Sequence, residues 1–159
     1  MKKIKLSQGK YALLDDDDYE IISKNKWFLG IDGYARRNFY MSNGKQGAIL
    51  MHRQIMNPIK GMDVDHINHN TLDNRRSNLR IVTRSQNQMN SSSRKNSTSK
   101  YKGVFWHKRD CKWVSQIRMN GKLKSLGYFN KETDAAFAYN VKAKELFGEF
   151  CYLNKVRGK

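Results

Sequence analysis

The sequence predicts an α+β fold that is built from two modules joined by a linker. Apolar and alternating runs that are typical of strands occur in both halves of the chain, and each half also contains a helical pattern. Between the halves, residues 88–100 read QMNSSSRKNSTSK, a polar stretch without apolar periodicity that is typical of a linker. We therefore expect an N-terminal module over residues 1–90, a linker over 91–99 and a C-terminal module over 100–154.

The chain is strongly basic, with 31 Lys and Arg against 14 Asp and Glu in 159 residues and a net charge of +17. Residues 91–159 hold 16 basic and 5 acidic side chains, whereas residues 61–90 hold 4 and 3. Such an excess of positive charge indicates a polyanionic partner, above all nucleic acid, although it also favours solubility. The C-terminal part is expected to hold the polyanion, and the nearly neutral centre suits a cation site.

A membrane partner is not expected. No apolar run reaches the roughly 20 residues of a spanning helix, and the start MKKIKL is not followed by the apolar stretch of a signal peptide. We therefore expect a cytoplasmic protein. Cys111 and Cys151 lie far apart and outside any CxxC pattern, so neither a structural zinc site nor a disulfide is expected.

The first 60 residues predict short strands and one helix, expected over Tyr19–Lys26. The acidic run Asp15–Asp18 precedes this helix, where carboxylates favour the helix N-terminus. The run can also be read as a metal site, but capping accounts for it more simply. Strands are expected over Tyr11–Leu14, Phe28–Tyr40 and Gly47–His52, with a turn at Asn43-Gly44 and a lead-in strand through Met51–Arg53.

The C-terminal module is expected to be a three-stranded antiparallel sheet with one helix packed on it. Asn120-Gly121 suits a two-residue hairpin turn, which needs positive φ. The helix is expected to begin after Asn130 as N-cap and to end at Gly148. The expected strands and helix are Tyr101–His107, Lys112–Met119, Lys122–Phe129 and Lys131–Phe147.

The centre of the chain predicts a strand, a polar loop, a second strand and a helix. Met62–His66 is expected to be a strand that ends in Asp-His, and Asn78–Thr83 is the second strand. Thr83–Gln86 fits the capping-box pattern S/T-x-x-E/Q, so a helix should start near Arg84 and carry Asn87.

These residue types suit the hydrolysis of a phosphodiester bond. Asp65 and the amide oxygen of Asn87 are hard oxygen ligands, and Mg²⁺ needs few of them because it keeps waters and takes phosphate oxygens. A neutral His66 can take a proton from the attacking water. An Asp-His pair in a polar loop can also be purely structural, but the asparagines and the capping box at these intervals favour a nuclease site.

His66, Asn78 and Asn87 fall at the three marks of the HNH nuclease motif, and residues 62–90 resemble this ββα-metal fold. The resemblance implies His66 as general base, Asp65 and Asn87 as metal ligands, and Asn78 as a brace that orients His66. The cofactor it implies is Mg²⁺, with Mn²⁺ as the alternative. It also suggests that Asp73-Asn74-Arg75 shape the loop. For His52, His69 and His107 a structural role is the favoured interpretation.

The C-terminal module resembles the AP2 DNA-binding domain over nearly all of residues 99–154. The matching segments are Tyr101–Val104, Lys112-Trp113, Ile117-Arg118, Leu126–Phe129, Ala135–Asn140 and Leu153-Asn154. In that family the sheet lies in the DNA major groove. The resemblance and the alternation of the second strand predict DNA contacts from Lys102, Phe105, His107, Lys112, Gln116 and Arg118. Where the plant AP2 pattern has Arg, this chain has Phe105 and His107, so a different base preference is expected.

Together the two resemblances predict a phage or mobile-element homing endonuclease. Its reaction would be metal-dependent cleavage of double-stranded DNA at a specific site, as a nick or a double-strand cut. The protein is expected to act as a monomer on DNA in a bacterial or phage-infected cell, without a small-molecule substrate. The first alternative is a non-catalytic DNA-binding regulator with a relic HNH module. The second is an RNA-binding protein that stacks bases on its sheet.

Overall fold

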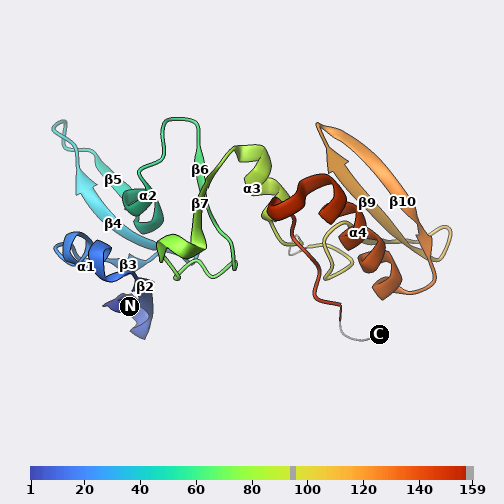
Figure 1. Cartoon of the computed structure of the whole chain (residues 1–159), viewed down its shortest axis with the longest axis horizontal. Helices are drawn as coiled ribbons and strands as arrows, with labels where there is room; N and C mark the ends of the chain where they lie inside the picture. The colour runs from blue at the N-terminus through green and yellow to red at the C-terminus, as the bar shows by residue number, and fades with distance from the viewer. Residues whose placement is uncertain (94–95, 157–159) are drawn as a thin grey trace. The chain divides into compact units, whose positions relative to one another are not determined.

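The computed structural model of the chain describes residues 1–93 and 96–156. The chain forms two compact units, Met1–Asn87 and Gln88–Lys159, and the division falls inside helix α3 (Arg84–Asn90). Figure 1 follows the elements of both units along the chain. Of the expected linker at 91–99, residues 94–95 lie outside the described residues, and the rest belongs to the second unit. Ser99 there is buried, and its hydroxyl donates to Glu132 at 2.7 Å.

The first unit begins with an antiparallel pair, β1 (Lys2–Lys5) and β2 (Tyr11–Leu14), followed by α1 (Asp16–Ile22). Three carboxylates of the acidic run lie in the first turn of α1, so this helix begins and ends earlier than the sequence predicts. The expected strand at residues 28–40 is two strands, because the chain turns at Gly33, which has φ +84°. The resulting antiparallel sheet has the order β3 (Phe28–Leu29), β4 (Ala35–Tyr40), β5 (Gln46–Leu50).

The expected strand through Met51–Arg53 is wrong: β5 ends at Leu50, and α2 (Met51–Met56) follows directly. The physical reason is the spacing of its apolar residues. Met51 and Ile55 are four residues apart and both are buried, which is the spacing of one helix face. The helix ends at Asn57, which adopts the left-handed conformation with φ 42°.

The centre of the unit is the predicted strand–loop–strand–helix. Strand β6 (Asp63–His66) pairs antiparallel with β7 (Leu79–Val82), after a short 3₁₀ helix at Arg76–Asn78, and α3 follows. The capping box is formed as predicted. The Thr83 hydroxyl accepts the Gln86 N–H at 3.2 Å, and the Gln86 side chain accepts the Thr83 N–H at 2.8 Å.

The loop between β6 and β7 is fixed to the N-terminal elements of the same unit. Leu13 of β2 donates its N–H to the carbonyl of Leu72, and its own carbonyl accepts the N–H of Asn74. From the same loop, the Arg76 guanidinium binds both carboxylate oxygens of Asp18 in α1 at 2.8 Å. Leu14, in the core beneath, is fully buried. The second half of the loop is therefore anchored on the core, whereas residues 67–70 are exposed.

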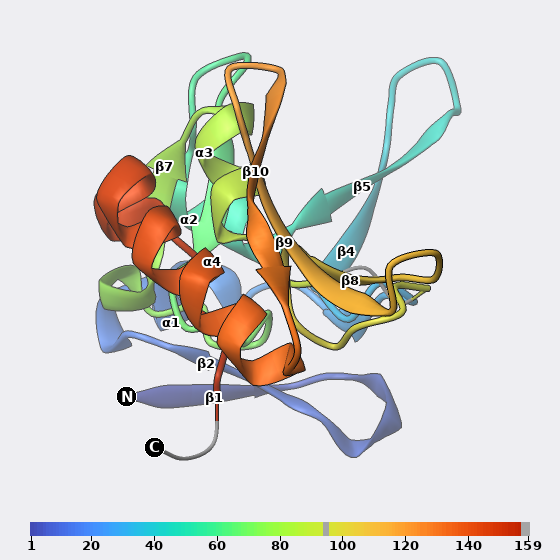
Figure 2. The same cartoon turned by 90° about the vertical axis from the view of Figure 1, so that its right-hand side faces the viewer.

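The second unit contains a sheet of β8 (Val104–His107), β9 (Lys112–Met119) and β10 (Lys122–Phe129), in the order β10–β9–β8. A long helix, α4 (Glu132–Phe147), packs against it, as Figure 2 shows. Asn120 and Gly121 both have positive φ, as the predicted hairpin turn requires. The helix starts at Glu132 with Lys131 as N-cap residue, so Asn130 is not the cap and instead accepts a hydrogen bond from Lys112. In the second unit, α4 is followed by a 3₁₀ helix at Gly148–Phe150. The first unit has a further 3₁₀ helix at Ser7–Gly9.

The core of the second unit lies between α4 and the facing side of the sheet. Ile117 of β9 packs with Tyr139 and Ala143 of α4, and all three are buried. Gly103 lies so close to Tyr139 that a Cβ there would be 2.1 Å from the ring. In the part of the chain that the structure describes, no helix is long and apolar enough to cross a membrane.

Candidate active site

His66 is the last residue of β6 and is almost completely buried, with 4 % of its surface exposed. Its Nε2 lies 3.4 Å from Oδ1 of Asn74 in the following loop. Burial lowers the pKa of the His66 imidazole below its usual value, and this outweighs the hydrogen bond to the Asn74 oxygen and the charges of Asp65 and Asp73. The imidazole is therefore neutral at neutral pH, which is the form that can accept a proton.

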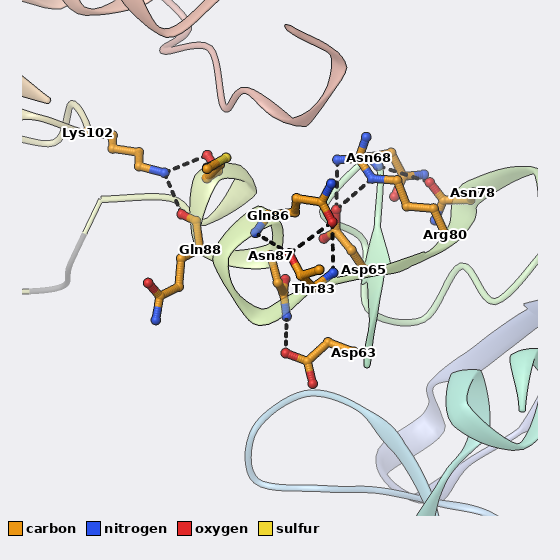
Figure 3. Close-up of polar contacts among 11 residues, drawn as sticks. Asp63, Asp65, Asn68, Asn78, Arg80, Thr83, Gln86, Asn87, Gln88 and Lys102 are labelled. Atoms are coloured by element: carbon orange, nitrogen blue, oxygen red, sulfur yellow. Dashed lines mark hydrogen bonds and ion pairs between the residues drawn. The ribbon is translucent and has the colours of Figure 1, made fainter. Parts of the chain in front are cut away.

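Asp65 is held by Arg80, the residue directly opposite it in β7. Both Nε and Nη2 of the guanidinium donate to Oδ2 of the carboxylate, at 2.9 and 2.8 Å, and Figure 3 shows this pair. Asp65 is 7 % exposed. The structure thus places a positive group on the carboxylate that the sequence assigns to a metal ion.

Asn87 belongs to the first turns of α3 and reaches β6, as Figure 3 shows. Its amide Nδ2 donates to Oδ2 of Asp63 at 3.3 Å. Asp63 and Asp65 are two residues apart in β6, so their side chains leave the same face of the strand. The capping box sets the start of α3, and this brings Asn87 to the face of β6 that carries Asp65.

These residues suit a divalent cation in their donor chemistry. Within the described residues, no group of three or more His, Cys, Asp or Glu side chains forms a metal site. A site that takes one carboxylate from Asp65 and one amide oxygen from Asn87 suits Mg²⁺, because that ion keeps several waters. The bound Arg80 guanidinium shows that the Asp65 carboxylate already attracts a cationic group in the protein alone.

Asn78 crosses the loop between the two strands. Its Oδ1 accepts the N–H of Asn68 at 2.9 Å, and its Nδ2 donates to the carbonyl of Asp73 at 2.8 Å. Its main-chain carbonyl accepts the N–H of Ile67, the residue after His66, at 2.9 Å. Asn78 therefore fixes both the start and the end of the loop that begins at His66.

Two rings that the sequence analysis left outside the site surround His66. His52 of α2 meets it edge to face with ring centroids 5.0 Å apart, and the Tyr34 centroid lies 5.8 Å away. His52 is 5 % exposed, and its Nδ1 is buried without a hydrogen-bond partner among the described residues. Burial, followed by the charges of His66 and Arg53, lowers the pKa of His52 to about 3, so it too is neutral.

Sequence reasoning missed Tyr34 and Arg80, and it gave His52 and Asn74 structural roles without a contact to His66. The contact of Arg80 with Asp65 could have been predicted from the sequence, because antiparallel pairing of the two predicted strands sets these residues opposite each other. The aromatic neighbours come from the turn before β4 and from α2, and no local spacing connects these segments to His66. Burial raises the pKa of Tyr34, with the charges of Asp32 and Asp65 adding to it, so its hydroxyl stays protonated.

In the second unit, five predicted DNA-contacting residues share one face of the sheet. Residues paired directly across an antiparallel sheet point to the same side. His107 pairs with Lys112, and the alternation along β8 and β9 places the others with them. This face is opposite to Ile117, which packs on α4. The five residues are Phe105, His107, Lys112, Gln116 and Arg118.

Lys102 lies elsewhere and has a different environment. Its ammonium donates to the carbonyl of Gln88 at 2.9 Å and to that of Met89 at 2.7 Å, at the end of α3 (Figure 3). Burial lowers the pKa of Lys102 to about 8. The ammonium is thus engaged inside the second unit rather than with the five residues of the sheet face.

Comparison with known proteins gives the family. Residues 57–89 match the family described as HNH endonuclease. The chain is 35 % identical over 155 residues to a protein of Acanthamoeba polyphaga mimivirus described as an uncharacterized HNH endonuclease, covering 94 % of this chain and 77 % of that one. It is 31 % identical over 91 residues to Protein 3.8 of Escherichia phage T7, covering 57 % and 74 %. No solved structure matches the chain.

The family match ends at residue 89, so the likeness of the second unit to the AP2 domain stays a prediction. The strands β6 and β7 and all of helix α3 except Asn90 lie within the matched residues, together with His66, Asn78 and Asn87. The matched motif and the relative aligned along 94 % of the chain agree, and the chain belongs to the HNH endonuclease family.

Proposed function

We propose that the protein is a metal-dependent endonuclease that hydrolyses phosphodiester bonds of double-stranded DNA at a specific site. Family membership gives the endonuclease class. The observation that carries the mechanism is the position of His66, a buried neutral imidazole at the end of β6 and next in the chain to Asp65. A general base has to be unprotonated at the working pH, and burial keeps His66 in that form.

In this proposal His66 takes a proton from a water molecule while the water oxygen attacks the phosphorus. The bond from phosphorus to the leaving oxygen breaks, and that oxygen is then protonated by solvent. Asn74, whose Oδ1 lies 3.4 Å from Nε2 of His66, holds the orientation of the ring. Asn78 acts as a positioning residue, since it fixes the main chain directly after His66. His52 and Tyr34 support the ring and exclude water from its sides.

The residues that would hold the divalent cation are Asp65 and Asn87. A bound Mg²⁺ or Mn²⁺ supplies electrostatic stabilisation of the charge that develops on the leaving oxygen. Asp63 supports this assignment, because it accepts a hydrogen bond from Nδ2 of Asn87 and so directs the amide. Arg80 neutralises Asp65 in the protein alone and would have to leave Oδ2 when a cation binds there.

The second unit would hold the duplex through the sheet face that carries Phe105, Gln116 and Arg118. Arg and Gln side chains can read base edges in the major groove. The excess of positive charge in residues 91–159 supports a phosphate contact. Lys102 is left out of this face, because its ammonium is bound to carbonyls at the end of α3.

We also propose that the enzyme acts as a monomer and nicks one strand, since the described residues carry one such site and one site cuts one strand at a time. The viral sources of both relatives support a homing endonuclease of the phage or mobile-element type that works in infected cells. An enzyme that nicks one strand and an enzyme that cuts both strands would require the same catalytic residues.

The test is a nicking assay on supercoiled plasmid that carries candidate sites, with Mg²⁺ or with EDTA. We expect nicking with Mg²⁺ only, and His66→Ala should lower its rate by about 10²- to 10⁴-fold while DNA binding is retained, because that is the usual worth of a general base. The matched control is His69→Asn, since His69 is exposed in the same loop and its φ of 63° tolerates Asn. Normal nicking by His66→Ala would refute the assignment.

The regulator remains the second candidate function. It is favoured by the strongly basic second unit, which suffices for DNA binding without cleavage. Absence of cleavage of any DNA with Mg²⁺ or Mn²⁺, while specific binding persists, would select it. Tighter binding of single-stranded RNA than of duplex DNA would instead select the RNA-binding alternative.

A further inference from the structure

A groove of about 420 Å³ lies on the first unit, outside the proposed catalytic residues. It is formed by β4, β5 and α2. Arg37 and Arg53 line it together with two amide side chains, Gln54 and Asn57, and with apolar residues of β5. Among the described residues that line it there is no carboxylate. Such a surface suits an anion with an extended shape.

Arg37 is held in the groove in a defined way. Its Nε donates to the side-chain oxygen of Gln54 at 2.8 Å, and its guanidinium lies 6.0 Å from the centre of the Trp27 ring. Its two terminal nitrogens have no hydrogen-bond partner within residues 1–93 and 96–156. The planar guanidinium is therefore pre-positioned, with its outer donors left to bind an external acceptor.

Arg53 connects the groove to the candidate active site. Its Nη1 lies 3.7 Å from Oδ1 of Asp63, and the other oxygen of Asp63 accepts the hydrogen bond from Asn87. The Arg53 guanidinium is further held by the carbonyl of Met62, at 3.2 Å from each terminal nitrogen. The groove thus ends one side chain away from a residue that is proposed to hold the cation.

We propose that this groove binds the phosphate backbone of the DNA duplex beside the scissile phosphate, with Arg37 as its principal contact. The inference rests on the proposed function for the identity of the nucleic acid. Arg binds phosphate oxygens through two parallel N–H groups, and such contacts fix the register of a protein on the duplex without reading sequence. The groove thereby sets which phosphate reaches His66, independently of the sheet face in the second unit.

The test measures binding rather than cleavage. The full chain with His66→Ala, in EDTA, is titrated with a duplex that contains the cleavage site, at several salt concentrations. We expect Arg37→Gln in this background to bind about tenfold more weakly at low salt, as expected for one charge-assisted contact. The slope of log K against log salt should fall by about 0.9, the value for one phosphate contact. Hydroxyl-radical protection should disappear on one flank of the cleavage site only.

Two further variants keep the result interpretable. Lys24→Gln removes the same charge from an exposed position outside the groove and should leave the salt slope unchanged. Arg37→Lys keeps the charge and the apolar stem, so it should retain most of the slope even where Arg37→Gln unfolds. The groove proposal is overturned if Arg37→Gln and Lys24→Gln behave alike, or if Arg37→Gln leaves the footprint unchanged. A wild-type protein that never nicks would instead refute the proposed function, and the salt slopes of the variants could still be compared on a duplex that the protein binds.

Discussion

The Arg80 guanidinium is hydrogen-bonded to the carboxylate of Asp65, which is proposed to hold the cation. The two residues are paired across β6 and β7, and the Arg80 side chain is only 14 % exposed. A divalent ion that binds Asp65 in the absence of DNA therefore competes with a guanidinium that is already hydrogen-bonded there. This competition should keep metal affinity low until another anion, such as a phosphate, attracts Arg80.

We accordingly expect Arg80→Met to bind Mn²⁺ about tenfold more tightly than the wild type without DNA. A charge-assisted hydrogen bond is worth roughly 1.5 kcal/mol, which corresponds to about a tenfold change in affinity. Free Mn²⁺ can be followed by electron paramagnetic resonance during a titration. Arg84→Met, which removes a charge at the start of α3, controls for general electrostatics. Equal affinities for the two variants would contradict the competition.

His52 makes the stability of the first unit depend on pH. Its pKa is about 3 in the folded chain against the usual 6.5, so between these values the unfolded chain binds the proton and the folded chain does not. Stability should therefore be complete above about pH 6.5 and should decrease as the pH falls toward 3. His52→Phe cannot take up this proton and should lose less stability on acidification.

Urea unfolding at pH 7 and at pH 4.5 measures this difference for each variant. The relevant quantity is the change between the two pH values, since Phe also alters packing at both. His69→Asn, in the exposed part of the loop, should keep the wild-type dependence. If His52→Phe loses as much stability on acidification as the wild type, other groups dominate the acid response.

At the scale of elements, helix α3 depends on its two ends because it has only seven residues. The capping box of Thr83 and Gln86 satisfies the first turn. At the other end, the carbonyls of Gln88 and Met89 accept hydrogen bonds from the Lys102 ammonium. Carbonyls of the last turn lack partners within a helix, so Lys102 supplies what the helix itself cannot.

This assignment separates Lys102 from the residues of the sheet face. We expect Lys102→Met to lower the free energy of unfolding by about 1 kcal/mol, the net worth of a typical hydrogen bond, and to leave the salt dependence of DNA binding unchanged. Arg118→Met should leave the free energy of unfolding unchanged and reduce the salt dependence of DNA binding, since Arg118 is exposed on β9. Chemical denaturation and salt titration of both variants decide the matter. A reduced salt slope for Lys102→Met would return it to the DNA-contacting set.

At the scale of the whole chain, local signals predict the order of elements well. The capping box and the Asn-Gly turn are short-range patterns with one structural solution, and both are present. Helix α2 was missed because Met51–Arg53 is too short to distinguish the residue period of a helix from that of a strand. Its helical spacing becomes visible only when Ile55 is included. Element type therefore fails where apolar runs are short.

The candidate site follows a different pattern. His66 and Asn87 could be singled out because the motif fixes their spacing, although their catalytic and metal-binding roles stay predictions. The contacts of the His52 ring and of the Asn74 oxygen with His66 could not be predicted, since they depend on how α2 and the loop pack. The HNH endonuclease prediction itself is confirmed by the family match and the mimivirus relative.

Helix α3 also limits how chains of this kind can recombine. Asn87 belongs to the first unit, whereas Met89, two residues later, packs on the core of the second. A crossover that joins the halves of two related genes must therefore conserve the length of this helix. One inserted residue would turn Asn87 by about 100° relative to Met89, so a chimaera spliced inside α3 would change the helix face on which one of these two side chains lies.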